Sequence, residues 1–192
     1  VQTCALPISL QSDATVFSFY ANKTMTTGEG GMVVTYNSNL AKRIKIMRLH
    51  GIDRDAFDRF QSKKPAWYYE VVAPGFKYNM TDIAAAMGIH QLRKLPRFLD
   101  RRQYLAQRYF EALVDLPLIL PTDDVDGGSH SWHLFVIRLR DDARMNRNQL
   151  IQFLSDKGIG SSVHYVPLHR QPYWRDRYQL TNDIFPETDK AY

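Results

Sequence analysis

The sequence predicts an α/β fold made of a larger and a smaller part, and three observations support that prediction. Two short segments rich in strand-forming apolar residues, Ala14–Phe19 and Met32–Thr35, flank a polar turn that contains glycine. Apolar residues at helical spacing follow the second of these segments. In the last third of the chain a strand pattern, a helix pattern and a second strand pattern follow one another, an order typical of α/β or α+β packing.

A helix is expected after the second apolar segment. It runs from a cap at Asn37 or Ser38 to about Leu49, because its apolar residues recur at near-helical spacing and Gly51 provides a stop. Residues 51–78 combine mixed charges, aromatic side chains and prolines, and they predict a long ordered loop. A loop of that length inside a compact domain usually has a function.

Two further helices are expected after this loop. The first is capped by Thr81 or Asp82 and runs through an alanine-rich stretch to about Leu92. The second runs from Arg97 to about Leu113 and is opened by Pro96, because proline is tolerated in the first turn of a helix.

The remaining part of the chain predicts a smaller module. Its expected elements are a strand, a helix and a second strand, at 133–139, 148–157 and 160–165. We expect a domain boundary near residue 115, with residues 12–115 in the larger domain and residues 116–192 in the smaller one.

Composition and charge favour an ordinary soluble protein. Hydrophobic residues make up 44% of the 192 residues, but no apolar run approaches the roughly 18 residues of a membrane helix. The net charge is +5, with basic residues scattered among acidic ones, which argues against a nucleic-acid-binding surface. The single cysteine, Cys4, excludes an internal disulfide framework. We therefore expect a cytoplasmic protein without a membrane or nucleic-acid partner.

The most informative residues for chemistry lie between the two predicted N-terminal strands. Lys23 follows Ser18 by five residues, and glycines stand at 28, 30 and 31. A neutral lysine amine attacks an aldehyde to form an imine, a serine hydroxyl can donate to a phosphate, and glycines let the backbone approach a ligand closely. A solvated lysine beside a hairpin turn would explain the same pattern without a ligand.

The segment FSFYANKTMTTGEGGMVVT, residues 17–35, closely resembles the lysine signature of the DegT/DnrJ/EryC1/StrS family of sugar aminotransferases. The serine, the lysine and the glycine group stand at the spacing of that signature. Three more segments resemble family blocks: APGFKYNMTDIAAAMGIHQLRKL (73–95), HSWHLFVIRL (130–139) and KGIGSSVHYVPLHRQPYW (157–174). The resemblance runs from about residue 12 to residue 192.

This resemblance implies a fold-type-I transferase that uses pyridoxal 5'-phosphate. The chain would hold the end of the large mixed-sheet domain and most of the smaller α+β domain. Lys23 would form the Schiff base with the cofactor and serve as general acid and base, and Ser18 would bind the cofactor phosphate. The reaction would move an amino group from a donor such as glutamate to a keto-sugar linked to a nucleotide, for polysaccharide or lipid A-type sugar synthesis.

The segment Gly75–Asn79 departs from the family pattern. Lys77 stands where many members have an asparagine that reaches the cofactor phosphate of the partner subunit, and Asn79 stands where they have an arginine. A lysine can bind phosphate as a point charge, so both residues are candidates for cofactor binding. The same K-Y-N variant resembles enzymes that make 4-amino-4-deoxy-arabinose, which favours a UDP-linked 4-keto-sugar as the acceptor.

Two histidines in the motif HYVPLH, His164 and His169, are candidates for substrate binding by the same resemblance. Their spacing does not predict a metal site, because carboxylates and cysteines are not nearby. His130 and His133 flank Trp132 and are interpreted as packing and turn residues.

The resemblance also implies that this chain is an incomplete copy of the enzyme. Residues 1–11 do not resemble the family, and the upstream groups that would stack on and bond to the cofactor ring are missing. A homodimer with shared active sites is expected. Two alternatives stay open: a non-catalytic relative or partner subunit that keeps the fold, and a transaminase of cyclitols or aromatic precursors.

Overall fold

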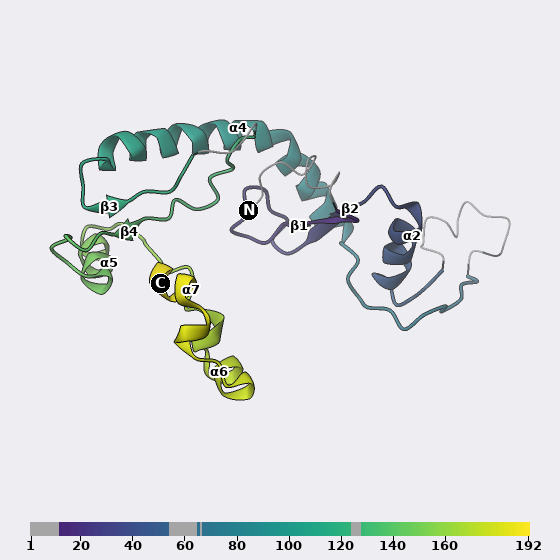
Figure 1. The fold of residues 1–192 in the computed structure, drawn as a ribbon. Helices are drawn as coiled ribbons and strands as arrows, with labels where there is room; N and C mark the ends of the chain where they lie inside the picture. Colours follow the sequence, from purple (N-terminus) through teal and green to yellow (C-terminus); the bar gives the residue numbers. More distant parts are fainter. Residues whose placement is uncertain (1–11, 54–64, 66, 124–127) are drawn as a thin grey trace. The chain divides into compact units, whose positions relative to one another are not determined.

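The computed structural model describes residues 12–53, 65, 67–123 and 128–192 (Figure 1), so the segment set apart at 1–11 lies outside the described residues. The chain forms two compact units. Unit 1 comprises Val1–Arg108 and Asp123–Phe135, and unit 2 comprises Tyr109–Thr122 and Val136–Tyr192. A single boundary near residue 115 stays a prediction, whereas contacts within the chain group Asp123–Phe135 with unit 1.

Unit 1 begins with an antiparallel hairpin. Strand β1, Thr15–Ser18, pairs with strand β2, Gly31–Val34, so that Ser18 lies opposite Gly31. Both strands predicted from the N-terminal sequence are confirmed, and their observed bounds differ from the predicted ones by one residue at each end. A side chain at Gly31 would place its Cβ only 2.8 Å from the backbone oxygen of Phe17, so the close pairing of the strands requires a glycine there.

Helix α2 of unit 1 spans Ser38–Met47 and begins where the sequence predicted it. Asn37 caps the helix, because its side-chain oxygen accepts hydrogen bonds from the backbone amides of Asn39 and Leu40, each at 3.0 Å. This cap satisfies two of the amides that a helix start leaves without partners.

The chain after α2 packs its backbone against the segment that precedes the next helix. The amide of His50 donates to the carbonyl of Phe76 at 2.8 Å, and the amide of Val72 donates to the carbonyl of Gly51 at 2.9 Å. Gly51 has a φ of +73°, and a Cβ there would lie 1.7 Å from the backbone oxygen of Ala73. In the described part of the predicted loop at 51–78, the two ends of the loop are thus held together by backbone hydrogen bonds.

A single helix, α4, spans Asp82–Leu113, so the prediction of two helices separated at Pro96 was wrong. Figure 1 shows α4 as one continuous ribbon. Proline removes one hydrogen bond and costs about 3 kcal/mol inside a helix. The helix continues because one inward-facing stripe crosses the proline without a change of phase, at positions 88, 91, 95, 99, 102 and 106.

The described part of unit 2 has two short strands, and only one of them lies where a strand was predicted. Strand β3, Leu118–Ile119, pairs antiparallel with strand β4, Arg138–Leu139, so the strand expected at 133–139 is reduced to its last two residues. The strand expected at 160–165 was wrong. A strand is held by ladder hydrogen bonds to a neighbour, and residues 160–165 have no partner strand within the described part of the chain.

The predicted helix of unit 2 is confirmed as α5, Arg147–Asp156. Its start is a capping box, in which Asn146 and Gln149 each bond the backbone amide of the other. Short helices complete the unit: η1 (Leu168–Arg170), α6 (Pro172–Tyr178), η2 (Asn182–Ile184) and α7 (Pro186–Ala191).

Few side chains are fully removed from water. Among the described residues the buried hydrophobic side chains are Phe19, Ala106 and Trp132, and all three belong to unit 1. Within the described ranges no helix combines the length and the apolar character that crossing a membrane requires.

The contact between Gly51 and Ala73 can be tested by substitution. Gly28 and Gly51 have nearly the same φ, +79° and +73°, but a Cβ at Gly28 meets nothing within 4 Å. Gly28→Ala should therefore cost only the left-handed backbone strain, about 1–2 kcal/mol. Gly51→Ala adds a steric overlap and should cost more than about 4 kcal/mol. Equal losses of stability in urea unfolding would contradict the close backbone packing.

Candidate functional site

Lys23 lies in a tight turn that directly follows β1. Its backbone amide donates to the carbonyl of Tyr20 at 3.0 Å. The turn closes on Phe19, whose carbonyl accepts from the amide of Thr27 at 2.9 Å and from Oγ1 of Thr26 at 3.0 Å. Because the Phe19 side chain is itself buried, the turn that carries Lys23 is anchored at its base.

The amine of Lys23 contacts a histidine that lies 110 residues later in the sequence. Nζ of Lys23 is 3.4 Å from Nε2 of His133, and both side chains are partly buried. From the sequence alone, His133 is interpreted as a packing or turn residue. Nothing local could have revealed this pair, because its two members come from different segments of the chain.

The segment around His133 is held against α4. The buried Trp132 donates from its indole Nε1 to Oε1 of Gln103 at 2.7 Å. Nη1 of Arg102 donates to the carbonyl of Trp132 at 2.6 Å and approaches the carbonyl of His133 at 3.4 Å. Trp132 has a φ of +47°, which is unfavourable for a bulky residue and persists only where the surroundings enforce it. These contacts with α4 therefore fix the position of the backbone at His133.

Ser18 lies at the end of β1, where it borders a small cavity. Its hydroxyl accepts a hydrogen bond from the amide of Tyr20 at 3.4 Å. The cavity has a volume of about 110 Å³ and is lined by Phe17, Ser18, Phe19, Thr24, Met25, Leu95, Leu99 and Ser131. Oγ1 of Thr24 is buried without a hydrogen-bond partner among the described residues. Three hydroxyl-bearing residues therefore line a space that holds a few water-sized groups and is too small for a typical whole cofactor.

Lys77 and Asn79 lie together in the segment before α4. Nζ of Lys77 donates to Oδ1 of Asn79. On either side of Lys77 the rings of Phe76 and Tyr78 stack with centroids 5.1 Å apart, and both aromatic side chains are exposed. The residues predicted for cofactor binding thus form two groups in unit 1, one at the β1 turn and one in this exposed segment.

The two histidines of the HYVPLH motif have different environments in unit 2. His164 is exposed, and its ring lies against Tyr165 with centroids 3.7 Å apart. His169 is buried; its Nε2 lies 2.8 Å from Oδ1 of Asp189, and its ring stacks on Phe185 at 4.8 Å. Direct substrate binding by His164 and His169 stays a prediction, and the contacts of His169 are those of a residue that holds its loop in place.

Asp189 carries the main ion pair of this loop. Nε of Arg170 donates to Oδ1 of Asp189 at 2.8 Å. The hydrogen bond from Arg170 lowers the pKa of Asp189 below its ordinary value of 3.8, and the His169 contact adds to this effect while partial burial opposes it.

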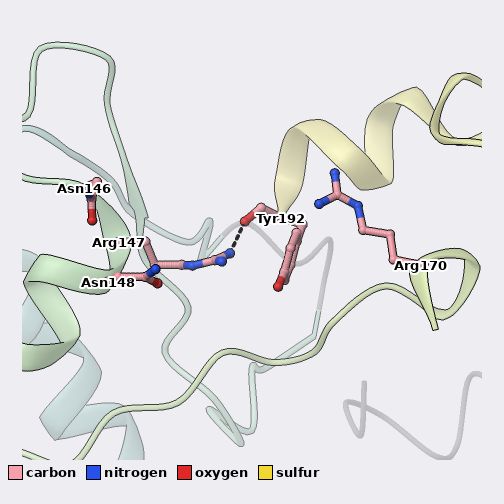
Figure 2. Close-up of a pocket in the computed structure, with 5 residues that line it drawn as sticks. All are labelled: Asn146, Arg147, Asn148, Arg170 and Tyr192. Carbon is pink, nitrogen blue, oxygen red and sulfur yellow. Dashed lines mark hydrogen bonds between the residues drawn. The ribbon is translucent and has the colours of Figure 1, made fainter. Parts of the chain in front are cut away.

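A second cavity lies in unit 2 and was not foreseen from the sequence. Its volume is about 320 Å³, and it is lined by Asn146, Arg147, Asn148, Arg170 and Tyr192. Figure 2 shows the two guanidinium groups on either side of the Tyr192 ring, with Cζ of Arg147 at 4.3 Å and Cζ of Arg170 at 4.9 Å from its centroid. These are cation–π contacts, which account for the arrangement without a ligand. Within the described residues no group of three His, Cys, Asp or Glu side chains could hold a metal ion.

Comparison with known proteins shows one consistent family. The sequence model of the DegT/DnrJ/EryC1/StrS aminotransferase family matches residues 7–192, so the match extends into the segment 1–11 that the motifs had set apart. The spore coat polysaccharide biosynthesis protein SpsC of Bacillus subtilis is 41% identical over 182 residues, which cover 94% of this chain and 46% of SpsC. The chain spans about half the length of the curated relatives it matches.

Solved structures agree with the sequence relatives. The "Putative sugar aminotransferase Spr1654" from Streptococcus pneumoniae, in its PMP-form, has a TM-score of 0.83 at 31% identity, covering 94% of this chain and 46% of that one. The same protein in its PLP-form has a TM-score of 0.81 at 30% identity, covering 94% and 45%. PseC of Helicobacter pylori, an aminotransferase involved in pseudoaminic acid biosynthesis, has a TM-score of 0.76 at 29% identity, covering 88% and 43%.

The ion pair of Asp189 predicts a pH-dependent contribution to stability. A carboxyl group whose pKa is lowered in the folded state stabilises that state above its unfolded pKa, and the contribution disappears as the pH falls through the folded pKa. Asp189→Asn should therefore lower the unfolding midpoint at pH 7, and the difference from the wild type should shrink below about pH 4. The exposed Asp183→Asn serves as control. A difference that stays constant from pH 7 to pH 2 would contradict the ion pair.

Proposed function

The chain belongs to the DegT/DnrJ/EryC1/StrS aminotransferase family, and from this premise we propose that the full-length protein is a pyridoxal-phosphate-dependent sugar aminotransferase with Lys23 as its reactive amine. The observation that carries the proposal is the placement of Lys23. Its amine is partly buried on a turn anchored at the buried Phe19, where its position is set by the fold. Pre-positioning of a reacting group is worth several orders of magnitude in rate.

The residues present fit the chemical groups of pyridoxal phosphate. The amine of Lys23 suits its aldehyde, and the hydroxyl of Ser18 suits its phosphate. The charged amine of Lys77 and the amide of Asn79 suit a second phosphate contact. When bound, the cofactor supplies an electron sink that stabilises negative charge at the α-carbon of the amino donor.

Lys23 has two tasks in the proposed reaction. Its Nζ holds the cofactor covalently before the donor arrives. Once released, the same nitrogen would take a proton from the α-carbon of the donor and return it to the carbon that carries the aldehyde in the free cofactor, so one side chain would act first as base and then as acid. Both tasks require an amine at a fixed position, and the turn at Tyr20–Met25 provides that position.

We infer that the acceptor is a keto-sugar linked to a nucleotide, with UDP as the favoured nucleotide and glutamate as the favoured donor. The names of two relatives support a sugar acceptor, because SpsC acts in spore coat polysaccharide biosynthesis and PseC in pseudoaminic acid biosynthesis. In unit 2, the exposed His164 would hydrogen-bond sugar or phosphate oxygens, while His169 would hold the loop through Asp189.

We further propose a cytoplasmic homodimer in which Lys77 and Asn79 reach the cofactor phosphate of the partner subunit. The exposure of Phe76 and Tyr78 supports this arrangement, because a stacked aromatic pair at the surface is typical of a contact region.

The proposal is tested with the full-length protein and added pyridoxal phosphate. A visible absorption band should appear, borohydride should fix the cofactor to the protein, and peptide mass analysis should locate it on Lys23. Adding glutamate before the reduction should remove the band. The Lys23→Arg variant should show neither band nor label, because a guanidinium does not form the covalent link. A label on another lysine would overturn the assignment and favour a non-catalytic relative.

Ser18 provides a second, independent prediction. If its hydroxyl donates to the cofactor phosphate, Ser18→Ala should raise the Kd for pyridoxal phosphate about 10-fold to 100-fold, the usual cost of losing a hydrogen bond to a charged group. Ser155→Ala, an exposed serine on α5, is the matched control and should leave the Kd unchanged. Equal affinities of the Ser18→Ala variant and the wild type would exclude Ser18 from the phosphate site.

A further inference from the structure

We propose that His133 is a positioning residue that receives the free amine of Lys23 whenever this amine is not covalently engaged. A catalytic role for His133 rests on the proposed function. Only an amine that is alternately bound to the cofactor and released needs a hydrogen-bond partner for its free state. The contact itself does not depend on the reaction.

The geometry assigns the two nitrogens distinct roles. Nζ of Lys23 lies 3.4 Å from Nε2 of His133. A lysine ammonium has three donors and no acceptor, so Nε2 has to be the acceptor and the ring proton sits on Nδ1. The separation is at the long end of the hydrogen-bonding range, as is common for catalytic groups in proteins without bound substrate.

The surroundings of the amine make the imidazole its main partner. Among the described residues Lys23 forms no ion pair with a carboxylate, so a neutral ring takes the place of a counter-ion. A neutral acceptor holds the amine without the strong Coulombic attraction that would resist its later release. The amine of Lys23 is thereby held in place but can still leave the imidazole to react.

The position of the imidazole is fixed from α4. Trp132 is bonded through its indole to Gln103, and Arg102 bonds the Trp132 carbonyl directly before His133. Charged groups that contact this segment include the amine of Lys23 and the guanidinium of Arg102. A further titratable side chain on the segment, His130, accepts from the Trp132 amide at 2.9 Å. The left-handed φ of Trp132 turns the chain sharply just before His133.

The experiment uses the full-length protein without cofactor and measures the acylation rate of individual lysines by mass spectrometry between pH 6 and pH 10. A hydrogen bond to the imidazole engages Nζ of Lys23 and restrains its approach to the acylating reagent. His133→Phe keeps a ring and removes the acceptor, so Lys23 should react about tenfold faster at neutral pH, relative to the exposed Lys42 in the same molecule. His133→Gln restores an acceptor and should bring the rate back to within about threefold of the wild type.

Two comparisons separate positioning from a general structural effect. His90→Gln, an exposed histidine on α4, should leave Lys23 labelling unchanged. If both His133 variants labelled Lys23 as the wild type does, or if Lys23 and Lys42 accelerated together, the proposal would be overturned. Where the Phe variant fails to fold, His133→Ala, which also removes the acceptor, provides the same comparison with the Gln variant.

The same variants distinguish this inference from the proposed function. In the cofactor-loaded enzyme His133→Phe should lower kcat for the glutamate half-reaction and leave the KM for glutamate within about twofold, because only the released amine is affected. Absence of a cofactor band in the wild type would refute the proposed function alone, while His133-dependent labelling of Lys23 would still establish the contact. A normal band with labelling independent of His133 would refute the inference alone.

Discussion

The carbonyl of Phe19 is the point on which the candidate site depends. It accepts two hydrogen bonds from the Thr26–Thr27 backbone and side chain, which close the turn that follows β1. Because the Phe19 ring is one of the few buried apolar side chains among the described residues of unit 1, this anchor is tied to the core. The position of Lys23 within the turn follows from that anchor. A flexible side chain is thereby presented from a rigid base, which is the usual arrangement for a group that forms and breaks a covalent bond.

A second constraint comes from the unbroken helix α4. The helix carries Leu95 and Leu99, which line the cavity beside Ser18, and one turn later Arg102, which holds the segment that bears His133. If the helix were interrupted at Pro96, Leu95 would no longer lie on the same helix face as Leu99 and Arg102. The cost of the missing proline hydrogen bond is therefore offset by a continuous face that contacts two parts of the site. The helix thus connects the hairpin to the histidine segment within unit 1.

Local features of the fold could be predicted from the sequence, and features that depend on distant partners could not. The β1–β2 hairpin and the cap at Asn37 follow from strand propensity and capping chemistry within a few residues. The strand expected at 160–165 was wrong because its apolar pattern is insufficient without a neighbouring strand. Lys23 and Ser18 were found through a motif, and the pairing of Lys77 with Asn79 lies within another. The contact between Lys23 and His133 spans 110 residues and has no local signal.

In the proposed function, the turn after β1 presents Lys23 as the attachment point of a pyridoxal-phosphate cofactor. The most direct test is a crystal structure of the full-length protein grown with pyridoxal phosphate. We expect continuous electron density from Nζ of Lys23 to the cofactor, with the hydroxyl of Ser18 within hydrogen-bonding distance of the phosphate. Density that joins the cofactor to Lys77 or another lysine, or a cofactor phosphate far from Ser18, would contradict the account.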